Sequence, residues 1–153
     1  MDEHQRFMGI AYQEALKALD EGEVPIGAVI VHENRIIGRG YNRIEKLSDA
    51  TAHAEIIAIS AASSTIASWR LNNCTLYVTL EPCLMCLGAV MQSRIETIVF
   101  GASDPRAGAI TSFHFRPEVE RTYRCFPSII PDVMAEECGQ LLTTFFARLR
   151  KKC

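Results

Sequence analysis

The 153-residue chain lacks the features of membrane, fibrous and exported proteins. No apolar run approaches the roughly 20 residues that span a bilayer, and no basic N-terminal segment precedes an apolar stretch. Glycine contributes only nine residues and no segment repeats at a long period, which excludes collagen-like and solenoid architectures. We therefore expect a cytoplasmic protein without membrane contact.

An excess of charge of one sign is also missing. Sixteen Lys and Arg residues stand against 18 Asp and Glu residues, so the net charge is only -2. This balance gives no general case for nucleic-acid binding, although a local basic patch is still compatible with it. With 48% apolar residues, disorder is excluded as the main state. We expect a single folded domain over residues 1–153.

Apolar spacing and turn residues predict alternating helices and strands. Helices are expected over 3–21, 52–62, 82–93 and 132–151, with Pro82 in a first turn and Asp132 as a cap. Strands are expected over 24–31, 35–41, 75–79 and 97–101, the first two as a hairpin. Residues 42–51 and 104–108 are predicted to be loops, and residues 109–131 show no clear period. This alternation predicts an α/β fold.

Two of the six cysteines, Cys83 and Cys86, form a close pair. In a chain without export signals, such a pair indicates metal or redox chemistry more often than a disulfide. Cysteines three residues apart lie on one face of a helix, so both sulfurs can reach one ion. A helix N-terminus also favours the thiolate form that metals bind.

His53, at the start of another expected helix, is a candidate third ligand. Three protein ligands leave one tetrahedral position for water, which is typical of catalytic zinc. Glu55 should not share the ligand direction of His53, and we assign it the proton transfer between water and substrate. A lone Cys-x-x-Cys is more often a thiol pair or structural half-site, but its occurrence with His-x-Glu favours catalytic zinc. Cys74 is the only nearby candidate for a fourth, structural ligand.

The segments His53-Ala54-Glu55 and Pro82-Cys83-Leu84-Met85-Cys86 match the known signature of zinc-dependent nucleoside and nucleobase deaminases. Within that superfamily, the chain most resembles the bacterial tRNA adenosine deaminases. The resemblance extends over residues 23–29, 40–43, 51–55, 75–83, 99–102, 104–109 and 137–146.

The resemblance implies a cytidine-deaminase-like, three-layer α/β sandwich, in which helices cover both faces of a mixed sheet of about five strands. It implies one Zn²⁺ per subunit, held by His53, Cys83 and Cys86, with Glu55 as proton shuttle. The implied activity is hydrolytic deamination of adenosine to inosine at the wobble position of a tRNA anticodon. The implied assembly is a homodimer in which each active site is completed by its neighbour.

The same resemblance suggests residues that contact the tRNA anticodon stem-loop. They are Pro25, Asn42, the Ala54 backbone, Asp104, Arg106, Phe145 and Phe146. Phe145 and Phe146 are adjacent and cannot face the same way, so we expect one in the core and the other stacked on a base. Basic residues at the C-terminal end, including Arg148 and Arg150, contact phosphates or form a solvated helix end.

Two alternatives remain open from the sequence. A free nucleobase deaminase, acting on guanine or cytosine, would use the same zinc site and Glu55. A non-catalytic zinc-containing RNA-binding module would need no carboxylate beside the metal, so Glu55 argues against it. The segment 79–82 and the Phe145–Phe146 pair favour the tRNA enzyme.

Overall fold

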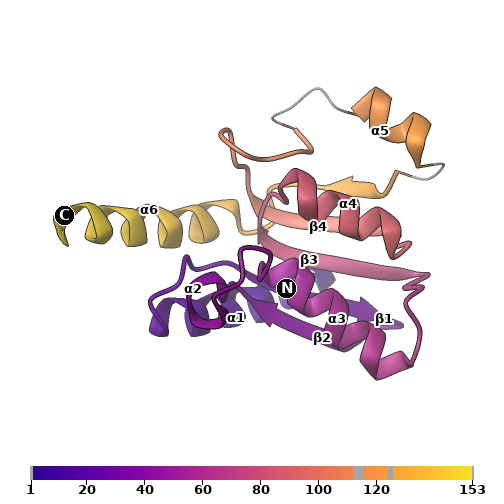
Figure 1. The fold of residues 1–153 in the computed structure, drawn as a ribbon, viewed down its shortest axis with the longest axis horizontal. Coiled ribbons are helices and arrows are strands. Elements are labelled where there is room, and N and C mark those ends of the chain that lie inside the picture. Colours follow the sequence, from indigo (N-terminus) through magenta and orange to yellow (C-terminus); the bar gives the residue numbers. More distant parts are fainter. Residues whose placement is uncertain (1, 112–115, 124–125, 153) are drawn as a thin grey trace.

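The computed structural model describes residues 2–111, 116–123 and 126–152. Its strands are β1 (Gly27–His32), β2 (Arg35–Tyr41), β3 (Cys74–Leu80), β4 (Thr97–Ala102) and β5 (Ser128–Ile130) (Figure 1). Its helices are α1 (Glu3–Asp20), α2 (Ile44–Leu47), α3 (Ala54–Ile66), α4 (Leu84–Gln92), α5 (Arg116–Thr122) and α6 (Ala135–Lys152). Within the described ranges, none of these helices is long and apolar enough to cross a membrane.

The strands form one five-stranded mixed sheet in the order β2-β1-β3-β4-β5. β1 is antiparallel to β2 and β3, whereas β3, β4 and β5 are parallel. Gly27 at the start of β1 pairs with Tyr41 at the end of β2, and Leu80 pairs with Ala102 at the ends of β3 and β4. The start of β1 and the ends of β2, β3 and β4 therefore share one edge of the sheet, where ligand sites of open α/β sheets form.

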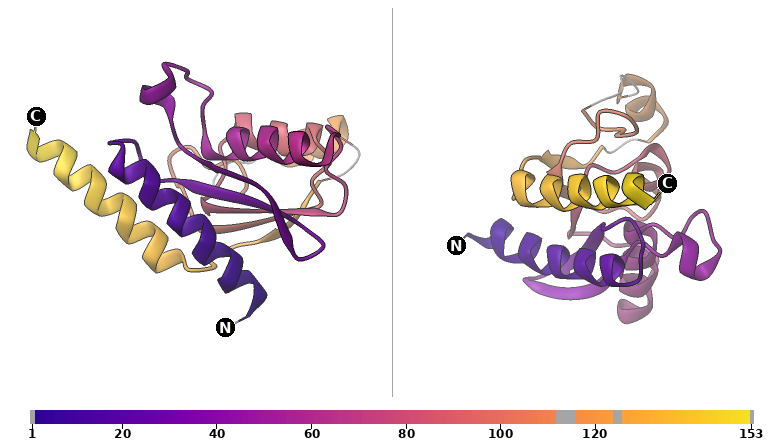
Figure 2. Two further views of the ribbon diagram at one scale, coloured as in Figure 1. Left: turned by 90° about the horizontal axis from the view of Figure 1, so that it is seen from below. Right: turned by 90° about the vertical axis from the view of Figure 1, so that its left-hand side faces the viewer.

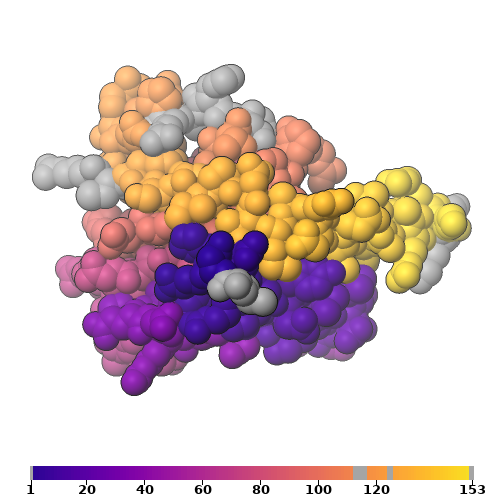
Figure 3. Space-filling view, turned by 180° about the vertical axis from the view of Figure 1, so that it is seen from behind, coloured from indigo at the N-terminus to yellow at the C-terminus, as the bar shows by residue number. Residues whose placement is uncertain are grey.

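Helices cover both faces of this sheet (Figures 1 and 2). Successive strand residues point to opposite faces, so Leu76 and Val78 of β3 pack in the core beneath α3 and α4. Tyr77, between them, packs against Phe7 of α1 in a second core that also includes Cys138 of α6. Helix α6 lies beside α1 on this second face (Figure 3). The expected three-layer α/β sandwich is confirmed.

The starts of β1 and α6 differ from the sequence prediction. β1 begins at Gly27 and not at Val24, because Pro25 has no N–H for a ladder and the Ile26 N–H bonds to the Val24 carbonyl. Helix α6 begins at Ala135, so Asp132 is not its cap. Asp132 has a φ of 64°, and the next amide bonds to the Phe100 carbonyl, which ties this turn to β4.

Other differences lie in segments without a strong apolar period. Helix α2 forms within the predicted 42–51 loop, and α5 and β5 form within residues 109–131, of which 112–115 and 124–125 lie outside the described residues. Helix α3 continues to Ile66, beyond the expected end at residue 62. Pro82 precedes α4, whose N-cap is Cys83, so Pro82 does not occupy the first helical turn.

Candidate active site

Three possible metal ligands come from the N-terminal ends of two helices. His53 is the N-cap of α3, Cys83 is the N-cap of α4, and Cys86 lies in the first turn of α4. Both helices lie on the same face of the sheet. Gly40 of β2 permits the close approach of α3, since a Cβ there would lie 2.3 Å from the Ala54 carbonyl oxygen. The close packing of α3 on β2 thus helps to place His53 near the two cysteines.

The three donor atoms are close enough to hold one metal ion. The Nδ1 atom of His53 lies 3.7 Å from the Sγ atom of Cys83 and 3.4 Å from that of Cys86. All three donors lie within 4.8 Å of one another. For metal bonds of about 2.0 Å to nitrogen and about 2.3 Å to sulfur, tetrahedral donors lie about 3.5 to 3.8 Å apart. The spacing therefore fits a tetrahedral site such as that of zinc.

No other His, Cys, Asp or Glu in the described part of the chain joins this group. Cys74, the candidate for a fourth ligand, is buried at the start of β3, and its Sγ atom lies 3.5 Å from the Asn72 carbonyl oxygen. Three protein donors therefore leave a fourth tetrahedral direction for another ligand.

One of the three donors, Cys83, is a thiolate at neutral pH. A hydrogen bond from the Cys86 thiol, together with one to His53, lowers the pKa of Cys83 to about 4. The bond to Cys83 and burial raise the pKa of Cys86. The bond to Cys83 also raises the pKa of His53. A thiolate at neutral pH is the form of cysteine that binds metals.

Glu55 occupies the first turn of α3, beside the donor group. Its side chain is only 4% exposed, and burial raises the pKa of this carboxyl group. The residue also lines the cavity onto which His53 and Cys83 open. A carboxyl group with a raised pKa can take up and release a proton nearer neutral pH.

The site opens into a cavity of about 720 Å³ at the edge of the sheet where the strand ends meet. This volume is within the ~300 to 1,000 Å³ of small-ligand pockets. One wall includes Asn42 and Ile44, after β2, and another is the loop that follows β4. Helix α6 supplies a third wall with Phe146 and Arg150.

The structure brings most of the predicted substrate contacts to this cavity. Asn42, Ala54, Asp104, Arg106 and Phe146 all line it. Asn42 is 4% exposed; its Nδ2 donates to the Val24 carbonyl at 3.4 Å, whereas its buried Oδ1 has no hydrogen-bond partner among the described residues. The Asp104 carboxylate accepts the amide hydrogens of Arg106 and Ala107, both at 3.1 Å, and so shapes the loop.

Two predicted contacts lie outside the cavity lining. Pro25 is buried between Val24 and Ile26, which do line the cavity. Phe145 packs edge to face against Phe146, with ring centroids 5.4 Å apart, and only Phe146 reaches the cavity.

Several lining residues were not found from the sequence. Besides the predicted Phe146 and Arg150, the α6 wall comprises Gly139, Leu142 and Thr143. Their spacing of three and four residues is that of one helix face, which the periodicity could have shown. Glu81 also lines the cavity and is 2% exposed. Its position directly after an apolar strand is the sequence feature that could have indicated a place at the site.

Comparisons with known proteins agree with this geometry. The family model of the MafB19-like deaminases matches residues 2–150. A tRNA-specific adenosine deaminase of Bacillus subtilis (strain 168) is 45% identical over 152 residues, which cover 99% of this chain and 94% of the relative. Its counterpart in Haemophilus influenzae is 48% identical over 150 residues, covering 97% and 86%.

Solved structures show the same similarity to deaminases. A structure from a study of A-to-I editing by tRNA:A34 deaminases superposes with a TM-score of 0.85 at 41% identity, over 90% of this chain and 99% of that one. A guanine deaminase from Bacillus subtilis is more distant, with a TM-score of 0.63 at 27% identity over 81% and 94% of the two chains. The chain therefore belongs to the family of tRNA-specific adenosine deaminases.

Proposed function

We propose that this protein hydrolyses adenosine to inosine at the wobble position of a tRNA anticodon, with release of ammonia. The observation that carries this proposal is the donor group of His53, Cys83 and Cys86 beside Glu55, at a cavity of about 720 Å³. The near full-length similarity to tRNA-specific adenosine deaminases supports the same substrate.

We assign one Zn²⁺ per chain to His53, Cys83 and Cys86. Two sulfurs and one imidazole nitrogen are a donor set that suits zinc, and their separations fit its tetrahedral bond lengths. When bound, zinc supplies a Lewis acid that lowers the pKa of a coordinated water to about 7.

Glu55 moves the protons of the reaction. Its carboxylate accepts a proton from the attacking water and delivers it to N1 of the adenine, while the oxygen bonds to C6. Transfer of a further proton to the exocyclic amino group lets the C6–N bond break and ammonia leave. Adenosine and one water are thereby converted to inosine and ammonia.

The remaining walls bind the nucleotide. Asn42 Oδ1, which has no hydrogen-bond partner among the described residues, is available to accept a hydrogen bond from the nucleoside. The Ala54 backbone lines the cavity and is available to the edge of the base. Phe146 offers a ring for stacking, and Arg106 and Arg150 offer cations for phosphates. Asp104 shapes the loop that carries Arg106. Extruding a base from a single-stranded anticodon loop costs little, which favours this substrate over a duplex.

We also propose a homodimer of the cytoplasmic enzyme, in which each copy covers the start of the other's α4. Leu84 and Met85 follow the ligand Cys83 and are 51% and 37% exposed. Exposed apolar side chains next to a site often mark an interface. Sedimentation should give a dimer for the wild type and a shift toward monomer for Leu84→Asp; a monomeric wild type would refute the assembly.

A free-base deaminase is the second candidate, because a guanine deaminase shares the fold at 27% identity. The test is incubation of the zinc-loaded protein with an anticodon stem-loop, guanine, cytosine and adenosine. We expect inosine in the stem-loop and no ammonia from the free compounds. Ammonia from a free base, without inosine in the RNA, would favour the second candidate.

A further inference from the structure

A buried carboxylate holds the loop that forms one wall of the cavity. Glu81 Oε1 accepts the Asp104 amide at 3.0 Å, and Oε2 accepts the amides of Ile110 and Thr111 at 3.0 and 2.8 Å. The Thr111 hydroxyl donates to Oε1 at 3.0 Å. One side chain from the end of β3 thus binds both ends of the segment 104–111.

The loop is fitted closely to this carboxylate. Gly108 lies against Glu81, and a Cβ at Gly108 would come within 2.3 Å of the Glu81 carboxyl carbon. The Ala109 amide bonds to the Pro82 carbonyl at 2.9 Å, next to the ligand Cys83. The position of Asp104 and Arg106 on the cavity wall therefore depends on contacts made around Glu81.

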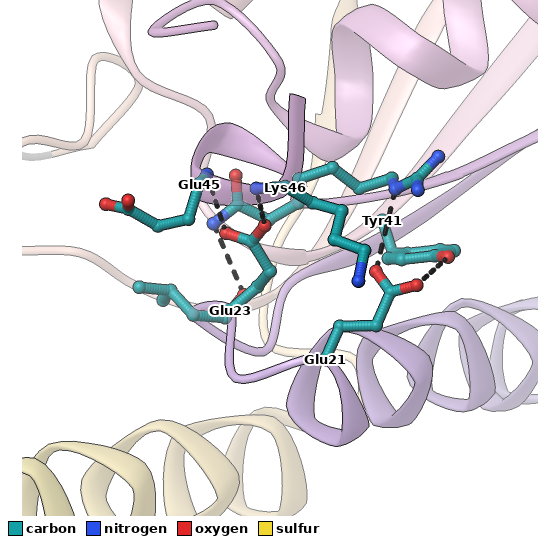
Figure 4. A network of polar contacts seen from close by, with 8 residues as sticks. Glu21, Glu23, Tyr41, Glu45 and Lys46 are labelled. Carbon is teal, nitrogen blue, oxygen red and sulfur yellow. Dashed lines mark hydrogen bonds and ion pairs between the residues drawn. The ribbon is translucent and has the colours of Figure 1, made fainter. Parts of the chain in front are cut away.

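A second buried carboxylate, Glu23, holds another wall of the cavity through backbone amides (Figure 4). Glu23 is 2% exposed and accepts the amides of Glu45 at 3.1 Å and Lys46 at 2.7 Å. These amides belong to α2, whose first residue, Ile44, lines the cavity. Asn42, two residues before α2, lines the same wall.

The neighbouring Glu21 adds a second anchor to this wall. It accepts a hydrogen bond from the Tyr41 hydroxyl at 3.1 Å and pairs with Arg43 at 3.5 Å (Figure 4). The segment from Tyr41 to Lys46 is therefore tied to the chain that follows α1. The bonds of Glu21 depend on the side chains of Tyr41 and Arg43. The bonds of Glu23 use backbone amides, which any sequence in the wall would offer, so Glu23 sets the shape of the wall and not its chemistry.

We propose that Glu81 and Glu23 are positioning residues, which hold the two walls of the substrate cavity in the shape that binds the nucleotide. The substrate part of this proposal rests on the proposed function. If a wall is released, the binding-competent state becomes a minor population, and the apparent affinity falls by that fraction. Once substrate is bound, the wall is in place and Glu55 acts as before. Loss of a carboxylate should therefore raise KM and leave kcat nearly unchanged.

The test compares Glu81→Gln and Glu23→Gln with Glu14→Gln as a matched control. Glu14 is 3% exposed, pairs with Lys17 of α1 and Arg39 of β2, and does not line the cavity. On an anticodon stem-loop we expect KM to rise about tenfold in the first two variants, because each loses a charge-assisted hydrogen bond. Their kcat should stay within about threefold of the wild-type value. The control should keep both constants, and all variants should keep bound zinc.

Gly108→Ala displaces the loop without changing Glu81, so it tests the same contact in case Glu81→Gln fails to fold. It should show the same rise in KM. Wild-type KM in the Gly108→Ala and Glu23→Gln variants, or a fall in kcat at constant KM, would overturn the proposal.

A measurement without substrate separates this proposal from the proposed function. In Glu81→Gln, the amides of Asp104, Ile110 and Thr111 should exchange with deuterium about tenfold faster than in wild type, whether or not the protein deaminates tRNA. Unchanged exchange at these amides would refute the positioning role. Absence of inosine from the wild type would refute only the proposed activity.

Discussion

The Nδ1 atom of His53 lies 3.4 Å from the Sγ atom of Cys86, although 33 residues separate them in the chain. The first residue caps α3 and the second lies in the first turn of α4. The two helices cover the same face of the sheet, so the fold and not the local sequence brings these donors together. The metal site should therefore be coupled to folding.

Replacing Cys86 tests this coupling. Cys86→Ala should lose zinc and lower Tm by about 10 °C, because binding free energy of the metal is lost from the folded state. Cys74→Ala is the matched control: Cys74 is also buried but lies outside the donor group, so its variant should keep zinc. Metal analysis and thermal unfolding measure both effects. Full zinc in Cys86→Ala would show that the ligand set is wrong.

Asn42→Ala should weaken substrate binding. Its Oδ1 is buried without a partner among the described residues, and its Nδ2 makes only a 3.4 Å bond to the Val24 carbonyl. Removing this side chain should cost little folding stability, but it should remove the proposed hydrogen bond to the nucleoside completely. Steady-state kinetics on a stem-loop should show a KM about tenfold higher. An unchanged KM would exclude Asn42 from substrate recognition.

The adjacent phenylalanines should behave differently. Phe146 reaches the cavity and Phe145 does not. Phe146→Ala should weaken stem-loop binding at least about fivefold, since stacking contributes ~1 to 3 kcal/mol per base. Phe145→Ala should change Kd less than about twofold. Fluorescence anisotropy measures both, and equal losses would contradict stacking on Phe146 alone.

Ionisation of Tyr77 should lower the stability of the fold at alkaline pH. The residue is 2% exposed, and burial raises its pKa to about 12. Folding therefore favours the neutral phenol: this stabilisation is complete below the ordinary pKa of about 10 and is lost as the pH rises from there through about 12. The free energy of unfolding should fall by about 2 kcal/mol over that range. In Tyr77→Phe the decrease over this range should be about 2 kcal/mol smaller than in the wild type, since other buried groups such as Cys138 also have a raised pKa. An equal decrease in both proteins would show that Tyr77 does not contribute to it.

The sequence predicted the helices, strands and ligands that have a recognisable pattern within a short stretch of the chain. A helical period of apolar residues located α1, because one face of that helix is buried. Short apolar and β-branched runs located the β1–β2 hairpin, β3 and β4; β1, β3 and β4 are buried along nearly their whole length. The spacing of Cys83 and Cys86 predicted a shared ion for a similar reason. His53 was joined to them as a candidate because it stands at the start of another expected helix, and the family signature supported this assignment.

Helix α2, the loop after β4 and the turn at Asp132 could not be predicted, because they depend on contacts between residues that are distant in the sequence. Helix α2 is short and is stabilised by Glu23, and the loop after β4 is held by Glu81, so neither wall has a periodic signal of its own. The turn at Asp132 forms because the chain bonds to Phe100 of β4. Both positioning carboxylates look like ordinary surface acids in the sequence, and only their burial reveals their partners.

On the proposed function, Glu55 moves protons at a metal site that it does not help to hold. The most direct measurement determines zinc per chain and inosine formed in an anticodon stem-loop, for wild type and Glu55→Gln. We expect about one zinc in both proteins and a loss of at least about 10³-fold in turnover for the variant, on the scale of general acid–base catalysis. Retained turnover in Glu55→Gln, or loss of its zinc, would contradict it.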